Sequence, residues 1–253
     1  MEVLDVCGRN ALIESAANDD VDIIEALLLR KANLNQQDSL GRTALMEACA
    51  EGHTVIVFQL LATLGFTPPL AHMDPDTDLY TEILSSPLYD EGRKLNLDLQ
   101  DWDGRTALIC ACQEGHTDIA LALIRAGAAM NETSKMSDNV LDKSFGRTAL
   151  IEACEIGLKP VVEALIDAGA DLNKCDTRGR TALISSCVWG HDDIAKGIKG
   201  SLYYTQPICF GDLFTRLIYV IVLFSNSPDS WWLRHEHARG NHGHVCFDGD
   251  NPK

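Results

Sequence analysis

The hydrophobic residues of this chain recur with a helical period in short segments. Two segments carry apolar side chains at i, i+1, i+4 and i+5: Ile23, Ile24, Leu27 and Leu28 in one, and Val161, Val162, Leu165 and Ile166 in the other. That spacing puts the four side chains of a segment on one face of an α-helix. Each segment therefore predicts an amphipathic helix that buries one face.

A shorter helix is predicted before the amphipathic one, because residues suited to helix ends bracket it. A threonine that can accept a hydrogen bond from the first turn is followed nine residues later by a glycine that can adopt the left-handed conformation. The pairs are Thr43 and Gly52, Thr106 and Gly115, Thr148 and Gly157, and Thr181 and Gly190. Residues 35–41 and 173–179 are rich in turn-forming residues and predict hairpin-like loops between the helix pairs.

This unit is repeated along the chain. The sequence Gly-Arg-Thr-Ala-Leu begins at Gly41, Gly104, Gly146 and Gly179, and a weaker copy begins at Gly8. Two of the intervals are 33 residues long, which is the ankyrin period, and the other two are 63 and 42. On this motif the chain resembles an ankyrin-repeat protein over about residues 5–200. The resemblance implies an all-α solenoid of about five helix-turn-helix units with hairpin loops.

The motif departs from the Thr-Pro-Leu-His of the family at its last position. Here Thr-Ala-Leu is followed by an apolar residue, which is Met46, Ile109, Ile151 or Ile184. The hydrogen bonds that the resemblance implies for the histidine are therefore expected to be absent. Burial of the apolar side chains against the next repeat is expected to replace them.

The predicted organisation is a repeat domain over residues 1–200 and an irregular tail over residues 201–253. The two long intervals predict insertions at about 66–95 and 132–143, which either shape a binding surface or are mobile loops. Gly197 and Gly200 are expected to interrupt the last helix. The tail holds nine of the sixteen aromatic residues and no repeat. We expect it either to cover the open end of the array or to lie outside the native reading frame.

Charge narrows the class of partner. The formal net charge is −16, and all of it falls in residues 1–196. Such a surface repels phosphate, so no nucleic acid is expected and a basic or neutral protein partner is favoured. Residues 1–10 lack the features of a secretion signal, which favours a cytoplasmic or nuclear location. The apolar run at 217–224 is shorter than the about 20 residues of a spanning helix, so no membrane anchor is predicted.

No motif indicates catalysis, a metal or a cofactor. The chain has no phosphate-binding loop, nucleophile elbow or paired acid-base carboxylates, so neither an enzyme nor a small-molecule substrate is predicted. One cysteine recurs per repeat, and packed helices lie about 10 Å apart, too far to share a zinc ion, so these cysteines are predicted to pack as small apolar residues. They are Cys49, Cys112, Cys154 and Cys187.

The chain has two sets of histidines with side chains capable of hydrogen bonding or metal binding. His53, His116 and His191 follow the helix-ending glycines and are predicted to pack or hydrogen-bond in the turns. A tail cluster matches no structural zinc spacing, so no metal site is predicted there. Its members are His235, His237, His242, His244 and Cys246.

The resemblance implies that a protein partner contacts the hairpin tips and the first helices. The corresponding residues here are Ser39, Leu40, Trp102, Asp103, Phe145, Thr177 and Arg178 on the hairpins, and Glu14, Glu47, Glu152 and Trp189 on the helices. A row of arginines is expected to pair with nearby aspartates: Arg42, Arg105, Arg147 and Arg180 with Asp38, Asp101 and Asp176. The predicted function is an interaction scaffold or adaptor, and the alternative is a regulatory arm of a longer or membrane-associated protein.

Overall fold

The structure is a computed structural model that describes residues 4–66, 94–135 and 146–205. These residues form ten helices in five consecutive pairs and contain no strand beyond an isolated bridge between Cys175 and Thr181. The pairs are α1 (Ala11–Ala17) with α2 (Val21–Leu29), α3 (Ala44–Glu51) with α4 (Thr54–Ala62), α6 (Ala107–Gln113) with α7 (Thr117–Arg125), α8 (Ala149–Ile156) with α9 (Lys159–Asp167), and α10 (Ala182–Val188) with α11 (Asp192–Thr205). The predicted all-α solenoid of helix pairs is confirmed.

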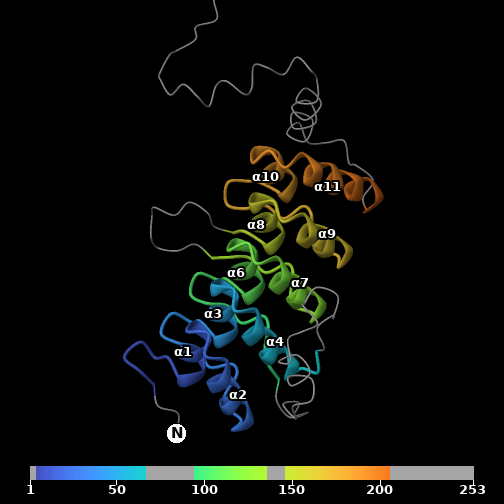
Figure 1. The fold of residues 1–253 in the computed structure, drawn as a ribbon. Coiled ribbons are helices and arrows are strands. Elements are labelled where there is room, and N and C mark those ends of the chain that lie inside the picture. Colours follow the sequence, from blue (N-terminus) through green and yellow to red (C-terminus); the bar gives the residue numbers. More distant parts are fainter. Residues whose placement is uncertain (1–3, 67–93, 136–145, 206–253) are drawn as a thin grey trace, which may run out of the picture. The chain divides into compact units, whose positions relative to one another are not determined.

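The pairs stack in chain order (Figure 1). The first helices α1, α3, α6, α8 and α10 form one layer, each packed on the next. The second helices α2, α4, α7, α9 and α11 form the other layer in the same way. The loops before the first helices project on the side away from the second helices (Figure 1). The first helices and these hairpins therefore form one continuous side of the array.

The predicted helix ends are confirmed in their geometry. The hydroxyl of Thr43 accepts a hydrogen bond from the backbone N–H of Met46, and the equivalent threonines cap α6, α8 and α10 in the same way. Asn10 takes this role for α1. Gly52 has a φ of 82° and Gly157 a φ of 91° directly after their helices, a conformation that glycine adopts without steric cost. These caps make each first helix only seven or eight residues long.

Burial explains why the array tolerates the loss of the family histidine. Met46, Ile109 and Ile151 occupy that position and are all fully buried in the core. Small residues line the contact between first helices, where Cys49, Cys112 and Cys154 are buried and Cys187 is half-buried. The expectation that these cysteines pack in the core is confirmed for the first three.

The histidines of the turns link neighbouring repeats. His116 donates through Nε2 to the backbone carbonyl of Ala50 at 3.1 Å, and His191 donates to that of Glu155 at 3.1 Å. His53 donates through Nδ1 to the carbonyl of Ala16 at 2.9 Å. These contacts confirm the predicted hydrogen-bonding role of the turn histidines. The repeats therefore keep polar contacts with one another, although the histidine of the Thr-Pro-Leu-His motif is absent.

The expectation that glycines interrupt the last helix is wrong. Helix α11 continues from Asp192 to Thr205 through Gly197 and Gly200. Each glycine costs about 1 kcal/mol relative to alanine in a helix interior. Ile194, Ala195 and Ile198 bury the inner face of α11 and offset that cost, with Ile198 at the position where the other second helices carry leucine. The fifth repeat therefore has both of its helices.

Several sequence predictions lie outside the described residues. They concern most of the first insertion, the part of the second insertion after residue 135, the tail from residue 206 with its apolar run and histidine cluster, and Phe145. In the part of the chain that is described, every helix is too short or too polar to cross a membrane.

Candidate protein-interaction surface

The hairpins before the first helices are held by an aspartate at their base. In the hairpin before α3, one carboxylate oxygen of Asp38 accepts from the backbone N–H groups of Leu40 at 2.9 Å and Arg42 at 2.8 Å. Asp5, Asp101 and Asp176 make the corresponding bond to Arg9, Arg105 and Arg180. The tip of each hairpin is therefore a tight turn with a fixed backbone.

The predicted pairing of the arginine row with these aspartates is confirmed at three positions. The Nε atoms of Arg105 and Arg180 lie 2.9 Å from the carboxylates of Asp101 and Asp176, and that of Arg42 lies 3.5 Å from Asp38. Each of these aspartates is buried and supports its own hairpin. The arginines are thus part of the scaffold of the surface.

The fourth hairpin uses serine in place of aspartate. The Ser134 N–H donates to the carbonyl of Arg147, the Ser134 carbonyl accepts from the Gly146 N–H, and the Ser134 hydroxyl accepts from the Arg147 N–H at 3.0 Å. Because Ser134 is neutral, the guanidinium of Arg147 pairs instead with Glu152 at 3.1 Å and Glu155 at 2.7 Å. The second insertion therefore leaves the array between Ser134 and Gly146, at the tip of a hairpin.

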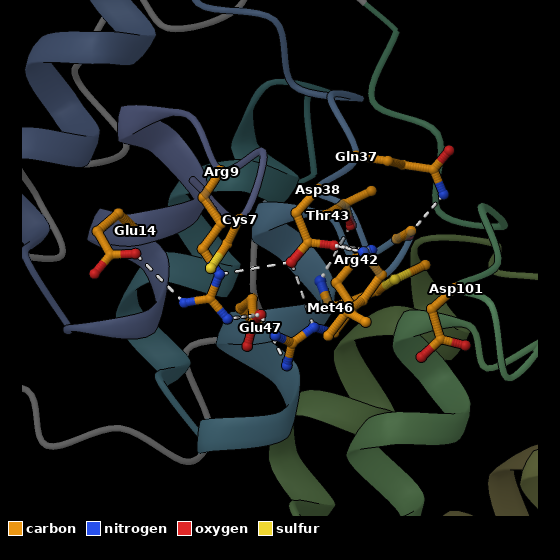
Figure 2. A network of polar contacts seen from close by, with 12 residues as sticks. Cys7, Arg9, Glu14, Gln37, Asp38, Arg42, Thr43, Met46, Glu47 and Asp101 are labelled. Atoms are coloured by element: carbon orange, nitrogen blue, oxygen red, sulfur yellow. Dashed lines mark hydrogen bonds and ion pairs between the residues drawn. The ribbon is translucent and has the colours of Figure 1, made fainter. Parts of the chain in front are cut away.

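Glu47 and Glu152, which the resemblance assigns to partner contact on the first helices, are both buried in ion pairs. Glu47 Oε1 lies 3.0 Å from Arg9 and 3.0 Å from Arg42, the latter in its own repeat (Figure 2). Burial raises the pKa of Glu47 above its ordinary value, and the two arginines partly offset that rise. Burial likewise raises the pKa of Glu152, opposed by Arg147.

The network around Glu47 joins the first two repeats. Arg9 reaches from the first hairpin to Glu47 and, at 3.5 Å, to Asp38, and both of these acidic residues belong to the second repeat (Figure 2). Glu14, also predicted to contact a partner, is exposed and lies 3.3 Å from Arg9. Of the predicted helix carboxylates, Glu14 alone presents an exposed side chain.

Most of the predicted hairpin residues are exposed. Leu40 is 49% exposed and Trp102 is 71% exposed, and Ser39, Thr177 and Arg178 are also exposed. Asp103 is half-buried and pairs with Arg105 at 3.4 Å. The Trp102 N–H donates to the carbonyl of Leu40 at 3.0 Å, so the two apolar residues sit on directly adjoining hairpins. We call Leu40 and Trp102 the hairpin-tip pair.

A second exposed group lies at the ends of the first helices. Trp189, which was predicted, is 53% exposed, and two unpredicted apolar residues accompany it: Val188, 62% exposed, and Ile156, 47% exposed. The equivalent residues of α3 and α6 are the exposed carboxylates Glu51 and Glu114. Alignment of the repeats with one another could have found these positions, since all lie within two residues of a helix-ending glycine. We call these five residues the helix-end strip.

Three buried cysteines of the first helices have raised pKa values. Burial raises the pKa of Cys110 and of Cys154 to about 12, and that of Cys112 further, so these thiols stay protonated. In the described part of the chain, no three His, Cys, Asp or Glu side chains gather in a way that could hold a metal ion. The arrangement is suited to contact with another molecule through its exposed side chains.

Comparison with known proteins agrees with this architecture. The family model described as "Ankyrin repeats (3 copies)" matches residues 1–72 and 129–201, and the model described as "Ankyrin repeat" matches residues 103–135. Together these matches cover more than half of the chain.

Two relatives share the repeats. The ankyrin repeat protein YahD of Escherichia coli (strain K12) is 32% identical over 130 residues, which are 47% of this chain and 64% of YahD. A protein of Oryza sativa subsp. japonica named "Probable E3 ubiquitin-protein ligase XBOS33" is 31% identical over 140 residues, which are 51% of this chain and 27% of that protein. The match thus spans less than two thirds of either relative. The helix pairs, the hairpins and both family models agree that this chain belongs to the ankyrin-repeat family.

Proposed function

We propose that the chain is an interaction scaffold or adaptor, without chemistry of its own, that binds a partner protein on its hairpins and first helices. The observation that carries this proposal is the hairpin-tip pair. Trp102 and Leu40 are exposed although their backbones are fixed to each other by a hydrogen bond. An aromatic side chain on a rigid backbone buries a large area at a small cost in conformational entropy, which is typical of an interface anchor.

The surroundings of the pair support the same proposal. Ser39, Thr177 and Arg178 are exposed polar residues at the tips of hairpins, as expected for the rim of an interface. The aspartates and arginines beneath them are already paired with each other. The partner would therefore meet a preorganised surface, which lowers the entropic cost of association.

The proposed location is the cytoplasm or the nucleus. Seven cysteines of the described residues are free thiols, and two of them, Cys7 and Cys175, are exposed. Free exposed thiols are typical of a reducing compartment. An intracellular protein partner fits this proposal.

Affinity capture with quantitative mass spectrometry tests the function. We expect the wild-type chain to retain a specific protein that the variant Leu40→Ser/Trp102→Ser loses. Direct binding to that purified protein should weaken about tenfold or more, because truncation of a central anchor costs about 2 kcal/mol. The matched control is Ile23→Ser, which removes an apolar side chain of similar exposure, 48%, from a second helix.

Two outcomes would contradict this proposal. If the hairpin-tip variant captures the same proteins with the same affinity as the wild type, while its thermal unfolding is unchanged, the pair is not the anchor. Loss of binding in Ile23→Ser to the same degree would also contradict the proposal, since that residue lies in the other layer.

The comparison with XBOS33 supports a second role. There the match is only 27% of the protein, so the repeats are one part of a longer chain that is named as a ligase. By analogy, this chain would serve as the recognition arm for an activity carried elsewhere. Co-purification of the captured partner with a separate catalytic protein would favour the adaptor, whereas a longer transcript in the same reading frame would favour the arm.

A further inference from the structure

The helix-end strip is continuous along the array. A Cβ placed on Gly115, directly after Glu114, would lie 3.8 Å from Cγ2 of Ile156 in the next repeat. In the same way, the ring of His116 lies against Gly52, directly after Glu51, and the ring of His191 lies against Gly157, directly after Ile156. The ends of α3, α6, α8 and α10 therefore adjoin one another in order.

The chemistry of the strip changes halfway along it. Glu51 and Glu114 stand at the ends of α3 and α6, and both are exposed. Ile156, Val188 and Trp189 stand at the ends of α8 and α10, and each exposes about half of its surface. Equivalent positions of one helical layer thus present carboxylates in the second and third repeats and apolar side chains in the fourth and fifth.

The two carboxylates are available to a ligand. Among the described residues, neither Glu51 nor Glu114 forms an ion pair, whereas Glu47 on α3 and Glu152 on α8 are held by arginines. The pKa of Glu47 is raised first by burial and also by the negative charge of Glu51, so the carboxylates at this end of α3 repel each other. A cation beside them would relieve this repulsion and gain their attraction.

We propose that the helix-end strip binds an extended protein segment with basic residues over α3 and α6 and large apolar residues over α8 and α10. This rests on the proposed function and names the chemistry of the partner. Neighbouring helices lie about 10 Å apart, so the strip extends about 30 Å. An extended chain rises about 3.3 Å per residue, and about nine residues would cover that length.

Charge complementarity selects this occupant over a second copy of the chain. A copy would bring its own net charge of −16 to a strip that already carries two exposed carboxylates. Like charges at an interface oppose association, whereas a basic segment is attracted and steered. The apolar residues of the strip would bury nonpolar surface of the partner. This burial contributes binding free energy that an exposed ion pair alone does not supply.

Fluorescence anisotropy with synthetic peptides of about 12 residues tests the proposal. Two block peptides carry Lys and Arg in one half and Leu and Trp in the other, in the two possible orders. One control peptide has the same composition in scrambled order, and another has Asp and Glu in place of the basic residues. We expect one block peptide to bind the full chain about tenfold more tightly than either control peptide.

Variants of the chain locate the two halves of the site. Glu51→Gln/Glu114→Gln should weaken binding of the block peptide about threefold and reduce the loss of affinity with added salt. Ile156→Ser/Trp189→Ser should weaken binding of the same peptide about tenfold at any salt concentration. The matched control is Asp118→Asn/Asp167→Asn, which neutralises two exposed carboxylates of second helices and should leave binding unchanged.

Two outcomes would overturn the proposal. One is that neither block peptide binds better than the scrambled peptide. The other is that the block peptide binds but is insensitive to both strip variants. In that case Leu40→Ser/Trp102→Ser shows whether the hairpin-tip pair holds the peptide, so the proposed function can stand while the assignment of the strip falls.

Discussion

The backbone N–H of Arg147 donates to the hydroxyl of Ser134 at 3.0 Å, although thirteen positions separate these residues. In the second repeat the same bond joins Asp38 and Arg42, which are four positions apart. The nine additional residues thus lie between two positions that keep the geometry of the hairpin. An insertion placed in this way lengthens the hairpin without shifting the register of the helices.

Removing the insertion should leave the array folded and slightly more stable. Deletion of residues 136–144 creates the sequence Ser-Lys-Phe-Gly-Arg, which has the spacing of Asp-Ser-Leu-Gly-Arg at 38–42. Because a shorter loop costs less entropy to close, the free energy of unfolding should rise by about 1 kcal/mol. Urea denaturation followed by circular dichroism measures it. A matched deletion of residues 134–142 removes Ser134 itself and should destabilise the chain.

The periodicity and the end-capping residues of the repeats were sufficient to predict most of the fold. The spacing of Thr43 and Gly52, with its copies, marks both ends of a helix through local geometry that needs no tertiary contact. The conformation of a hairpin tip is also determined by residues close in sequence, so the exposure of Leu40 and Trp102 follows from their position in a turn. Features determined within a few residues of the chain could be predicted from sequence.

The features that the sequence did not predict are those that depend on contacts between repeats. Glu47 is four residues from Thr43 on a short helix, and sequence gives no sign that Arg9 of the previous repeat reaches it. Gly197 and Gly200 weaken a helix locally, yet α11 persists because Ile198 is buried against the fourth repeat and its own first helix. The exposure of Ile156 cannot be predicted from its neighbours in the sequence, because an apolar residue at a helix end usually packs in the core.

Loss of the Glu47 carboxylate should destabilise the first two repeats strongly. The variant Glu47→Ala removes the nearer of the two buried carboxylates that Arg9 and Arg42 share and leaves them only Asp38 at 3.5 Å. Breaking a buried pair costs about 3 kcal/mol, and the partial exposure of the arginines reduces this to about 2 kcal/mol. Denaturant unfolding should show the decrease as a lower midpoint.

Glu14→Ala is the matched control for that variant. Glu14 also contacts Arg9, at 3.3 Å, but its side chain is 53% exposed. An exposed ion pair contributes less than about 1 kcal/mol. Equal destabilisation by the two substitutions would show that the burial of Glu47 is not the source of its effect.

The first repeat contains one residue whose backbone strain a glycine would remove. Lys31 has a φ of 61°, in the left-handed region, where Gly127 and Gly169 stand in the third and fourth repeats. A residue with a Cβ pays roughly 1–2 kcal/mol for this conformation. Lys31→Gly should therefore raise the free energy of unfolding by about 1 kcal/mol, measured by thermal and urea unfolding. Arg30→Gly, one residue earlier at a φ of −83°, should not stabilise the chain.

Buried thiols should make the chain lose stability in alkaline solution. Burial raises the pKa of Cys154 from 9.0 to about 12 in the folded chain, while in the unfolded chain the thiol ionises near 9. The unfolded state therefore releases this proton first, and the stabilising contribution, complete below pH 9, is lost as the pH rises towards 12. Between pH 8 and pH 10 the loss amounts to about 1.4 kcal/mol for this one residue.

Cys154→Ala separates this contribution from the other groups that ionise in the same range. The substitution removes the thiol and keeps a small apolar side chain, so stability at pH 7 should fall by only about 1 kcal/mol. The decrease between pH 8 and pH 10 should be about 1.4 kcal/mol smaller than in the wild type. Cys175→Ala, at an exposed hairpin position, should leave that decrease unchanged. Parallel curves for all three proteins would mean that the Cys154 thiol ionises as easily in the folded chain as in the unfolded one, and is therefore not buried between α8 and its neighbours.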